Sequence, residues 1–303
     1  MFLPRWPVVR RMPSVGVRAV EPGSFDSRSV PAGPEINASP RPRGRHVHRV
    51  RAAPGPRRGE ARAIRRSTRA EFGTVARMSV VIAGGHGRVA LTVSRLLAVR
   101  GERVSAVIRR PEQAGAVRDA GARPLVADLA TASTEDLTAF LTGARAVLYA
   151  AGAGLGVAPG QPDPVDHDAI VTFADAAEHA GVRRFVMLSA MGADPAARYR
   201  ENPLVETFLQ ARGRADENLL ARSALATTVI RPAWFRDRPG TGMVHLAERT
   251  GVGDIAREDV AAVLATLLST DSTSPRVLEL IAGTTPVHEA VARHSPPRRP
   301  APR

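Results

Sequence analysis

The sequence contains no cysteine and no lysine, and aromatic residues make up only 4% of its 303 residues. The absence of cysteine excludes disulfide bonds and thiolate chemistry and is compatible with a reducing compartment, so we expect a cytoplasmic location. All 43 basic residues are arginine, which excludes any site that needs a lysine amine. No apolar run approaches the roughly 20 residues of a membrane-spanning helix, and the N-terminus lacks the apolar core of a signal peptide.

The excess positive charge is confined to the two ends of the chain. The formal net charge of +14 would by itself be typical of a nucleic-acid-binding protein. However, residues 1–77 carry +12 and residues 291–303 carry +4, which leaves −2 for residues 78–290. The near-neutral middle argues against nucleic acid as a partner.

Residues 1–77 are rich in Pro, Gly and Arg and show no sustained hydrophobic period, so we predict that they are disordered. A basic arm for nucleic acid or membranes and a transit peptide are two functional interpretations. The arginine-only composition is also typical of a GC-rich gene read upstream of its start, and Met78 directly precedes the first predicted strand. We therefore favour Met78 as the natural first residue. The Pro/Arg-rich tail, 286–303, is also predicted to be disordered.

Residues 78–285 are predicted to form one α/β domain, because apolar runs typical of strands alternate with stretches of helical period. Strands are predicted at 79–84, 103–109, 123–129, 146–152, 183–190, 226–232 and 276–283. Helices are predicted at 88–101, 111–121, 133–143, 166–181, 204–223 and 257–269. This alternation predicts a Rossmann-type, doubly wound parallel sheet with helices on both faces.

The stretch SVVIAGGHGRVA, residues 79–90, places a glycine-rich turn between the first strand and the first helix. Gly84 would permit the tight turn, Gly87 would let the backbone approach a pyrophosphate, and Ala90 would let the helix pack close to the strand. The free N–H groups at the helix start would bind the phosphates. A tight turn with a purely structural role is the alternative, but the complete α/β pattern favours dinucleotide binding.

The residues after the second strand indicate which dinucleotide is bound. A carboxylate there would bind the 2′-hydroxyl of NAD, whereas this chain has Arg109 and Arg110. These arginines could pair with a 2′-phosphate, which favours NADP(H) over NAD(H). Two solvated loop arginines are the alternative. Asp128, at the end of the third strand, could contact the adenine or simply cap the following loop.

The chain resembles the atypical short-chain dehydrogenase/reductases, in particular their NAD(P)H-binding, NmrA-like branch, over residues 78–283. The matching pieces are IAGGHGRVA, VIRRPEQ, VADL, LYAAGAG, AAEHAGVRRFVMLSAMGA, VIRPAWF and REDVAAVLATLL, in the family's order and spacing. Together with the glycine motif, the resemblance implies cofactor contacts from Gly84, His86, Gly87, Arg88, Val89, Arg109, Asp128, Leu129, Ala151 and Gly152.

The resemblance also implies a catalytic pattern that this chain only partly carries. Working reductases of the family use a Tyr as proton donor, a Lys four residues later and a Ser on the fifth strand, because the oxyanion left by hydride transfer must be protonated. Ser189 matches the Ser, but Phe208 stands at the Tyr position and Arg212 at the Lys position. Arg212 could hold the nicotinamide ribose or be a surface charge, and Ser189 could simply be a strand-end hydroxyl bonded to backbone.

Other residues give weaker indications of a site. Asp166 and His167 start a helix at the ligand side of the sheet, where His167 could act as an acid, although an N-cap and an exposed first-turn residue are the simpler interpretation. His86 is expected to fill the glycine loop. Trp234 and Phe235 could form an apolar substrate wall or pack in the core. No cluster has metal-ligand spacing.

These observations favour an NADP(H)-binding oxidoreductase with a non-standard active site, acting on a quinone or a carbonyl compound. The alternative is a catalytically weak or inactive sensor that binds NADP(H) and regulates a partner. The expected ligands are a nicotinamide dinucleotide and a small molecule that the sequence does not identify. The sequence makes no prediction of oligomeric state.

Overall fold

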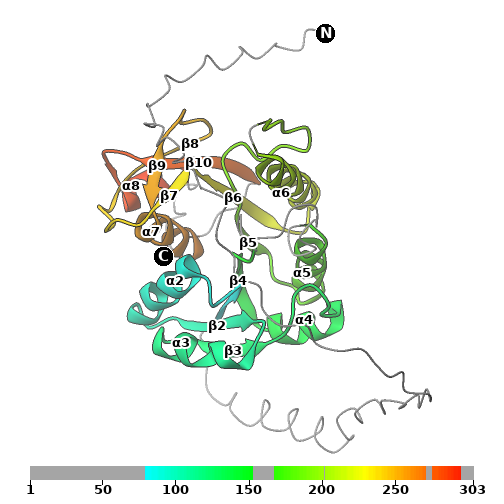
Figure 1. Ribbon diagram of the computed structural model, residues 1–303. Helices are drawn as coiled ribbons and strands as arrows, with labels where there is room; N and C mark the ends of the chain where they lie inside the picture. Colours follow the sequence, from blue (N-terminus) through cyan, green and yellow to red (C-terminus); the bar gives the residue numbers. More distant parts are fainter. Residues whose placement is uncertain (1–78, 153–166, 201, 271–274, 295–303) are drawn as a thin grey trace, which may run out of the picture. The chain divides into compact units, whose positions relative to one another are not determined.

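The computed structural model describes residues 79–152, 167–200, 202–270 and 275–294 (Figure 1). The predictions for the 1–77 segment, for Met78 and for Asp166 lie outside these residues. Within the described ranges, none of the helices combines the length and the apolar character that crossing a membrane would require.

Seven consecutive strands of a nine-stranded sheet are parallel, starting from the edge strand β3, in the order β3-β2-β1-β4-β5-β6-β10. They are β1 (Ser79–Ala83), β2 (Arg103–Ile108), β3 (Arg123–Val126), β4 (Ala144–Tyr149), β5 (Arg184–Leu188), β6 (Ala226–Pro232) and β10 (Arg276–Ala282). All seven were predicted as strands. The strand order reverses between β1 and β4, and open α/β sheets bind ligands beyond the strand ends at such a point.

Helices cover both faces of the sheet (Figure 1). One face carries α2 (Arg88–Val99), α3 (Ala114–Asp119), α7 (Arg257–Leu268) and α8 (Val287–Ala292), with the 3₁₀ turn η1 (Pro111–Gln113) before α3. The other face carries α4 (Thr134–Leu141), α5 (Asp168–His179) and α6 (Pro203–Ala221). Ser133 caps α4, because its hydroxyl accepts a 3.1 Å hydrogen bond from the Asp136 N–H. The predicted Rossmann-type α/β domain is therefore the observed fold.

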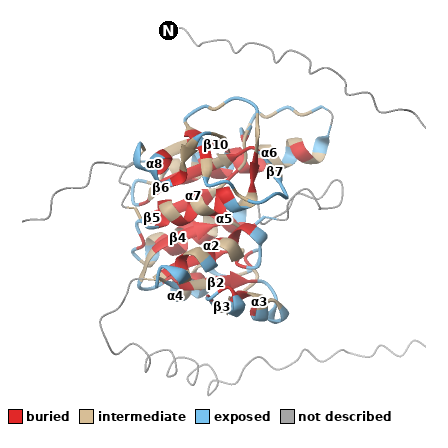
Figure 2. Cartoon of the chain, turned by 90° about the vertical axis from the view of Figure 1, so that its left-hand side faces the viewer, coloured by how far each residue is buried: buried red, intermediate tan, exposed pale blue. Residues whose placement is uncertain are grey.

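The apolar strands explain why the sheet is covered on both sides. Side chains alternate between the faces of a strand, so Val80 and Ile82 pack toward α2 and α7 whereas Val81 and Ala83 pack toward α4 and α5. All four are buried, and Figure 2 shows the central strands as buried between helices whose outer faces are exposed. A strand buried on both faces has few polar residues, which makes its sequence easy to recognise.

The C-terminal part differs from the prediction of a purely parallel sheet. Strand β8 (Met243–Ala247) pairs antiparallel with β10 and with β11 (Thr285–Pro286), extending one edge of the sheet. Strands β7 (Trp234–Arg236) and β9 (Asp254–Ala256) form a separate parallel pair. The prediction of disorder from residue 286 is wrong for the start of that segment, because helix α8 buries Val287 and Val291 against the core.

Candidate functional site

The glycine-rich turn between β1 and α2 lies directly against the end of β4. Gly84 has φ of +75°, and a Cβ added there would lie 2.5 Å from the Ala151 Cα, so the positive φ and the close contact both require glycine. Gly85 was not singled out from the sequence, yet its N–H donates to the Val107 carbonyl at 2.8 Å. A Cβ at Gly85 would lie 2.5 Å from the Ala106 Cβ. The turn is therefore packed between β2 and β4 at its backbone.

The N-terminus of α2 lacks a side-chain cap. Gly87 occupies the cap position with extended backbone, and the first turn contains no acidic residue. The Gly87 N–H donates back to the Gly84 carbonyl at 2.9 Å, which closes the turn. The first N–H groups of a helix have no partner inside the helix, and together with the helix dipole they form a binding place for an anion.

A cavity of about 380 Å³ lies at the carboxyl ends of β1, β2, β3 and β4, within the range of small-molecule sites. Eight of the predicted cofactor residues line it: Gly84, His86, Gly87, Arg109, Asp128, Leu129, Ala151 and Gly152. Five further lining residues were not predicted: Val107, Ile108, Gln113, Ala127 and Ala150. The structure thus gathers residues from four separate segments around one cavity.

The two other predicted cofactor residues do not line this cavity. Val89 is buried in the core beneath α2. The Arg88 side chain is exposed and pairs with Asp237, with 2.9 Å between Nη1 and Oδ1. Only the backbone of these residues, at the start of α2, is placed as a phosphate-binding turn would require.

The polar residues after β2 and β3 have separate positions. Arg109 and Arg110 are both exposed, and only Arg109 lines the cavity. The Arg110 N–H donates to the Gln113 side chain at 3.1 Å. Asp128 caps its loop, as one interpretation expected, by accepting from the Ala130 N–H at 3.1 Å, and it also lines the cavity.

The predicted catalytic residues Ser189 and Arg212 are both buried, with 6% and 4% of their surfaces exposed. The Ser189 hydroxyl donates to Oδ2 of Asp216 at 2.8 Å, so it bonds a carboxylate rather than backbone. Arg212 is not a surface charge, because its guanidinium donates to the carbonyls of Leu188 at 3.2 Å and Ala151 at 2.8 Å. Sequence reasoning missed Asp216, although it follows Arg212 by four residues and therefore lies on the same helix face.

The aromatic residues and the histidine named from the sequence have separate surroundings. Phe208 stacks on Arg212, with 5.3 Å from the guanidinium carbon to the ring centroid. Tyr149, in β4, is completely buried and makes an edge contact with Phe173. His167 was predicted in the first turn of a helix that starts at residue 166, but α5 begins at Asp168 and His167 is its N-cap residue. The His167 Nδ1 lies 2.8 Å from the Asp168 carboxylate.

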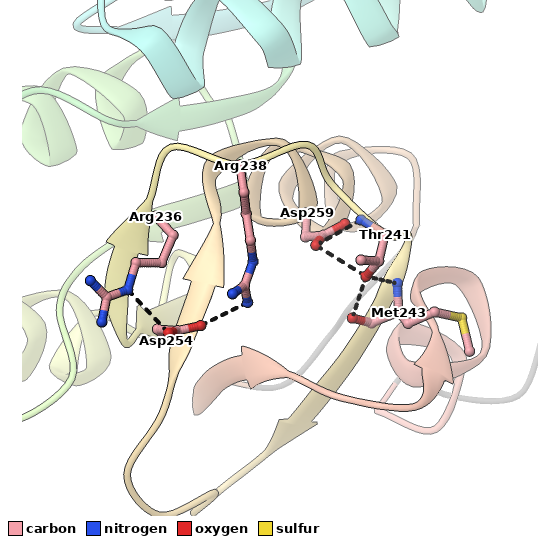
Figure 3. A network of polar contacts seen from close by, with 6 residues as sticks. All are labelled: Arg236, Arg238, Thr241, Met243, Asp254 and Asp259. Atoms are coloured by element: carbon pink, nitrogen blue, oxygen red, sulfur yellow. Dashed lines mark hydrogen bonds and ion pairs between the residues drawn. The ribbon is translucent and has the colours of Figure 1, made fainter.

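The segment after β6 carries a second set of charged contacts (Figure 3). Asp254 accepts from Arg236 at 3.1 Å and from Arg238 at 2.7 Å. Side-chain bonds from Arg236 and Arg238 hold the pKa of Asp254 below its usual value. Asp259, at the start of α7, accepts from the Thr241 N–H at 3.1 Å. These polar contacts add to the burial of Val244 and Leu246 of β8 in the core.

The aromatic pair that opens this segment is divided between solvent and core. Trp234 is 55% exposed, whereas Phe235 packs against the core with the Arg257 guanidinium 5.0 Å from its ring centroid. An apolar wall formed by both residues is therefore not what the structure shows. In the described part of the chain, no group of His, Cys, Asp and Glu side chains could hold a metal ion.

Comparison with known proteins gives consistent matches over this domain. The family model described as NAD(P)H-binding matches residues 84–271. The uncharacterized sugar epimerase YhfK of Bacillus subtilis is 32% identical over 217 residues, covering 71% of this chain and all of that protein. A putative NAD-dependent epimerase/dehydratase from Bacillus halodurans is 28% identical with a TM-score of 0.64, covering 71% of this chain and 99% of its own.

A second solved structure agrees in fold. The oxidoreductase ylbE from Lactococcus lactis is 23% identical with a TM-score of 0.63 and covers 73% of this chain and all of its own. The fold of this domain is thus similar to that of solved proteins named as an epimerase/dehydratase and as an oxidoreductase.

Proposed function

Because the chain belongs to the NAD(P)H-binding family, within the atypical short-chain dehydrogenase/reductases, we propose that it is an NADP(H)-dependent oxidoreductase with a non-standard active site. The observation that supports this most directly is the cavity that the glycine turn, Arg109, Asp128 and the end of β4 form together. The residues fit a dinucleotide: the turn permits close backbone approach, and the uncapped start of α2 suits a pyrophosphate.

The preference for NADP(H) over NAD(H) rests on Arg109. A guanidinium at the cavity edge would pair with the 2′-phosphate, whereas no carboxylate stands after β2 to bind a 2′-hydroxyl. Asp128, Leu129, Ala151 and Gly152 would line the remainder of the cofactor site. Placement in the NmrA-like branch and a cytoplasmic location belong to the same proposal.

The bound nicotinamide would supply the hydride chemistry, and the chain's own residues would orient the acceptor and exclude water. Without a Tyr and Lys pair, the site suits quinones, which accept hydride without a strongly placed proton donor, and carbonyl compounds that Ser189 could contact. Arg212 would contribute by holding the ends of β4 and β5 in place.

A sensor that binds NADP(H) without rapid turnover is the second candidate. Phe208 at the family's Tyr position and the engagement of the Arg212 guanidinium with two backbone carbonyls favour it. Both candidates require the cofactor, whereas only the first requires a reaction.

The test is a titration of the protein with NADPH and with NADH, following the fluorescence of the reduced cofactor, and then turnover with a panel of quinones. We expect tighter binding of NADPH and measurable oxidation of NADPH. Failure to bind either cofactor would contradict both candidates, and binding without turnover on any quinone would leave the sensor.

A further inference from the structure

A chain of buried polar contacts joins β5, α6 and β6 beside the cofactor cavity. Asp216 has no exposed surface, and one of its oxygens, Oδ2, accepts from the Ser189 hydroxyl at 2.8 Å and from Arg231 Nε at 2.9 Å. Such a carboxylate costs several kcal/mol to bury unless charged donors compensate. An apolar residue at this place could not accept these two hydrogen bonds.

Arg212, which lies four residues before Asp216 on α6, connects this region to the wall of the cavity. Arg212 donates to the carbonyl of Ala151, and Ala151 lines the cavity. The Ser189 N–H donates to the Ile230 carbonyl at 2.8 Å, which fixes the serine at the carboxyl end of β5. Ligands of this fold bind at that edge of the sheet.

The charges around Asp216 act in opposite directions. Burial raises the pKa of Asp216 above its usual 3.8, while Arg231 from β6, the Ser189 hydroxyl from β5 and Arg212 from α6 partly offset the rise. The net direction is upward. The protonated carboxyl is therefore more accessible here than on the protein surface.

The protonation state of Asp216 decides what the Ser189 hydroxyl can do. A serine hydroxyl has one proton to donate. When Asp216 is ionised, that proton points at Oδ2 and the serine can only accept from a ligand. When Asp216 is protonated, the carboxyl donates to Ser189, and the serine proton becomes available to another acceptor.

We propose that Asp216 is a positioning residue that directs the Ser189 hydroxyl and supplies the proton which Ser189 passes to the oxygen of the reduced substrate. This rests on the proposed oxidoreductase function. Once hydride from the reduced nicotinamide has formed a C–H bond at the carbonyl carbon, the substrate oxygen holds the electron pair of the former C=O π bond and forms an O–H bond with the Ser189 proton. Ser189 takes the proton of Asp216, and Asp216 becomes a carboxylate that is bonded by Arg231 and stabilised by the charge of Arg212, until a proton returns to it through Ser189 after the product has left. Asp216 and Ser189 thereby donate the proton that Phe208, at the position of the family's Tyr, cannot donate.

The decisive variant is Asp216→Asn. Arg231 can only donate, so the amide oxygen must take the Oδ2 position, where it also accepts from Ser189. The hydroxyl is then locked in the direction that it has beside ionised Asp216. Glu217→Gln is the matched control, because it makes the same chemical change on the next residue, which is exposed.

The first measurement needs neither cofactor nor turnover. The side-chain carboxyl of Asp216 is followed by ¹³C NMR of the full chain against pH, and assigned as the signal that Asp216→Asn removes. Ser189→Ala removes a donor to the carboxylate, so we expect the Asp216 titration to move to higher pH. An unmoved titration would overturn the proposal, whatever the chain turns over.

The second measurement is the pH profile of NADPH oxidation with a carbonyl substrate, 4-nitrobenzaldehyde, because reduction of a carbonyl depends on a placed proton donor more than reduction of a quinone does. We expect the rate to fall as pH rises through the titration of Asp216, and a pH-independent rate on the order of 100-fold lower in Asp216→Asn. Glu217→Gln should match the unmodified chain.

Unchanged pH dependence in Asp216→Asn would contradict the proton supply. If Asp216→Asn fails to fold, Ser189→Ala replaces it: the proposal expects that the fall in rate with rising pH is lost in this variant, and a fall that persists would contradict the proposal. Absence of all turnover would overturn the proton supply together with the proposed reaction, while NADPH binding and the NMR titration would still be measured.

Discussion

The guanidinium of Arg212, on α6, donates a 2.8 Å hydrogen bond to the carbonyl of Ala151, at the end of β4. A second nitrogen of the same group donates to the Leu188 carbonyl at 3.2 Å, at the end of β5. One side chain thus connects two strand ends, and one of the two residues that it contacts, Ala151, lines the cavity. A lysine at this position has a single ammonium group and could not span both carbonyls in the same way.

Replacement of Arg212 should therefore reduce stability even when the positive charge is kept. Arg212→Lys should lower the free energy of unfolding by about 2 kcal/mol, because one buried carbonyl loses its charged donor. Arg212→Ala should lower it by about 3 kcal/mol, because Asp216 also loses a neighbouring positive charge. Urea denaturation followed by circular dichroism measures both. An unchanged midpoint in Arg212→Lys would show that the two carbonyl contacts contribute little.

The central strands could be predicted because burial on both faces leaves an almost continuous apolar signal, as in β1 and β4. The short elements could not. Strands β7 and β9 have three residues each, too few to show a period of two, and they pair with each other rather than with the main sheet. Helix α8 has six residues and follows Pro286, so composition alone suggested a disordered tail.

Some residues of the site could likewise be predicted from the sequence, and others could not. The glycine turn has a local motif, and its lining residues followed from the ends of predicted strands. Asp216 was missed because an acidic residue on a helix with charged neighbours is expected to be exposed to solvent. Its only local signal is the four-residue spacing of Phe208, Arg212 and Asp216 on one helix face. The partner Ser189 is 27 residues away in sequence, and only the packing of α6 on β5 brings the two together.

Gly84→Ala should damage both folding and cofactor binding. The positive φ and the contact with Ala151 together predict a loss of at least about 2 kcal/mol in stability and a large loss of NADPH affinity. Gly115→Ala is the control, because no atom lies within 4 Å of the added Cβ. On an exposed helical position it should be neutral or stabilise by up to about 1 kcal/mol. Equal effects of the two substitutions would contradict the close packing of the turn.

Arg109→Gln should weaken NADPH binding by about tenfold, or about 1.4 kcal/mol, while leaving NADH binding nearly unchanged. The reason is the proposed pairing of Arg109 with the 2′-phosphate. Arg110→Gln removes the same charge one residue away, outside the cavity lining, and should have a smaller effect. Fluorescence titrations at two salt concentrations measure these affinities, and the Arg109 effect should shrink at high salt. A similar loss for both cofactors would remove the argument for NADP(H).

Asp237→Asn should change how stability depends on pH at the acidic end. Arg88, with a smaller contribution from Arg257, holds the pKa of Asp237 below its usual 3.8. A carboxyl with a lowered folded pKa contributes stability that is present above pH 3.8 and is lost as pH falls through the folded pKa. The melting temperature of the unmodified chain should therefore exceed that of the variant at pH 7, and the two should converge below pH 3.8.

Salt provides the control for this interpretation. Asp237 and Arg88 are both more than half exposed, so dissolved ions screen their attraction. Added NaCl at pH 7 should reduce the difference in melting temperature between the two proteins, whereas a difference caused by lost packing would persist.

The same substitution should also loosen the segment that follows β7, because Asp237 joins that segment to the start of α2. Limited proteolysis measures this as faster cleavage after Arg236 or Arg238. A difference in melting temperature that grows toward acidic pH would contradict the pairing of Asp237 with Arg88.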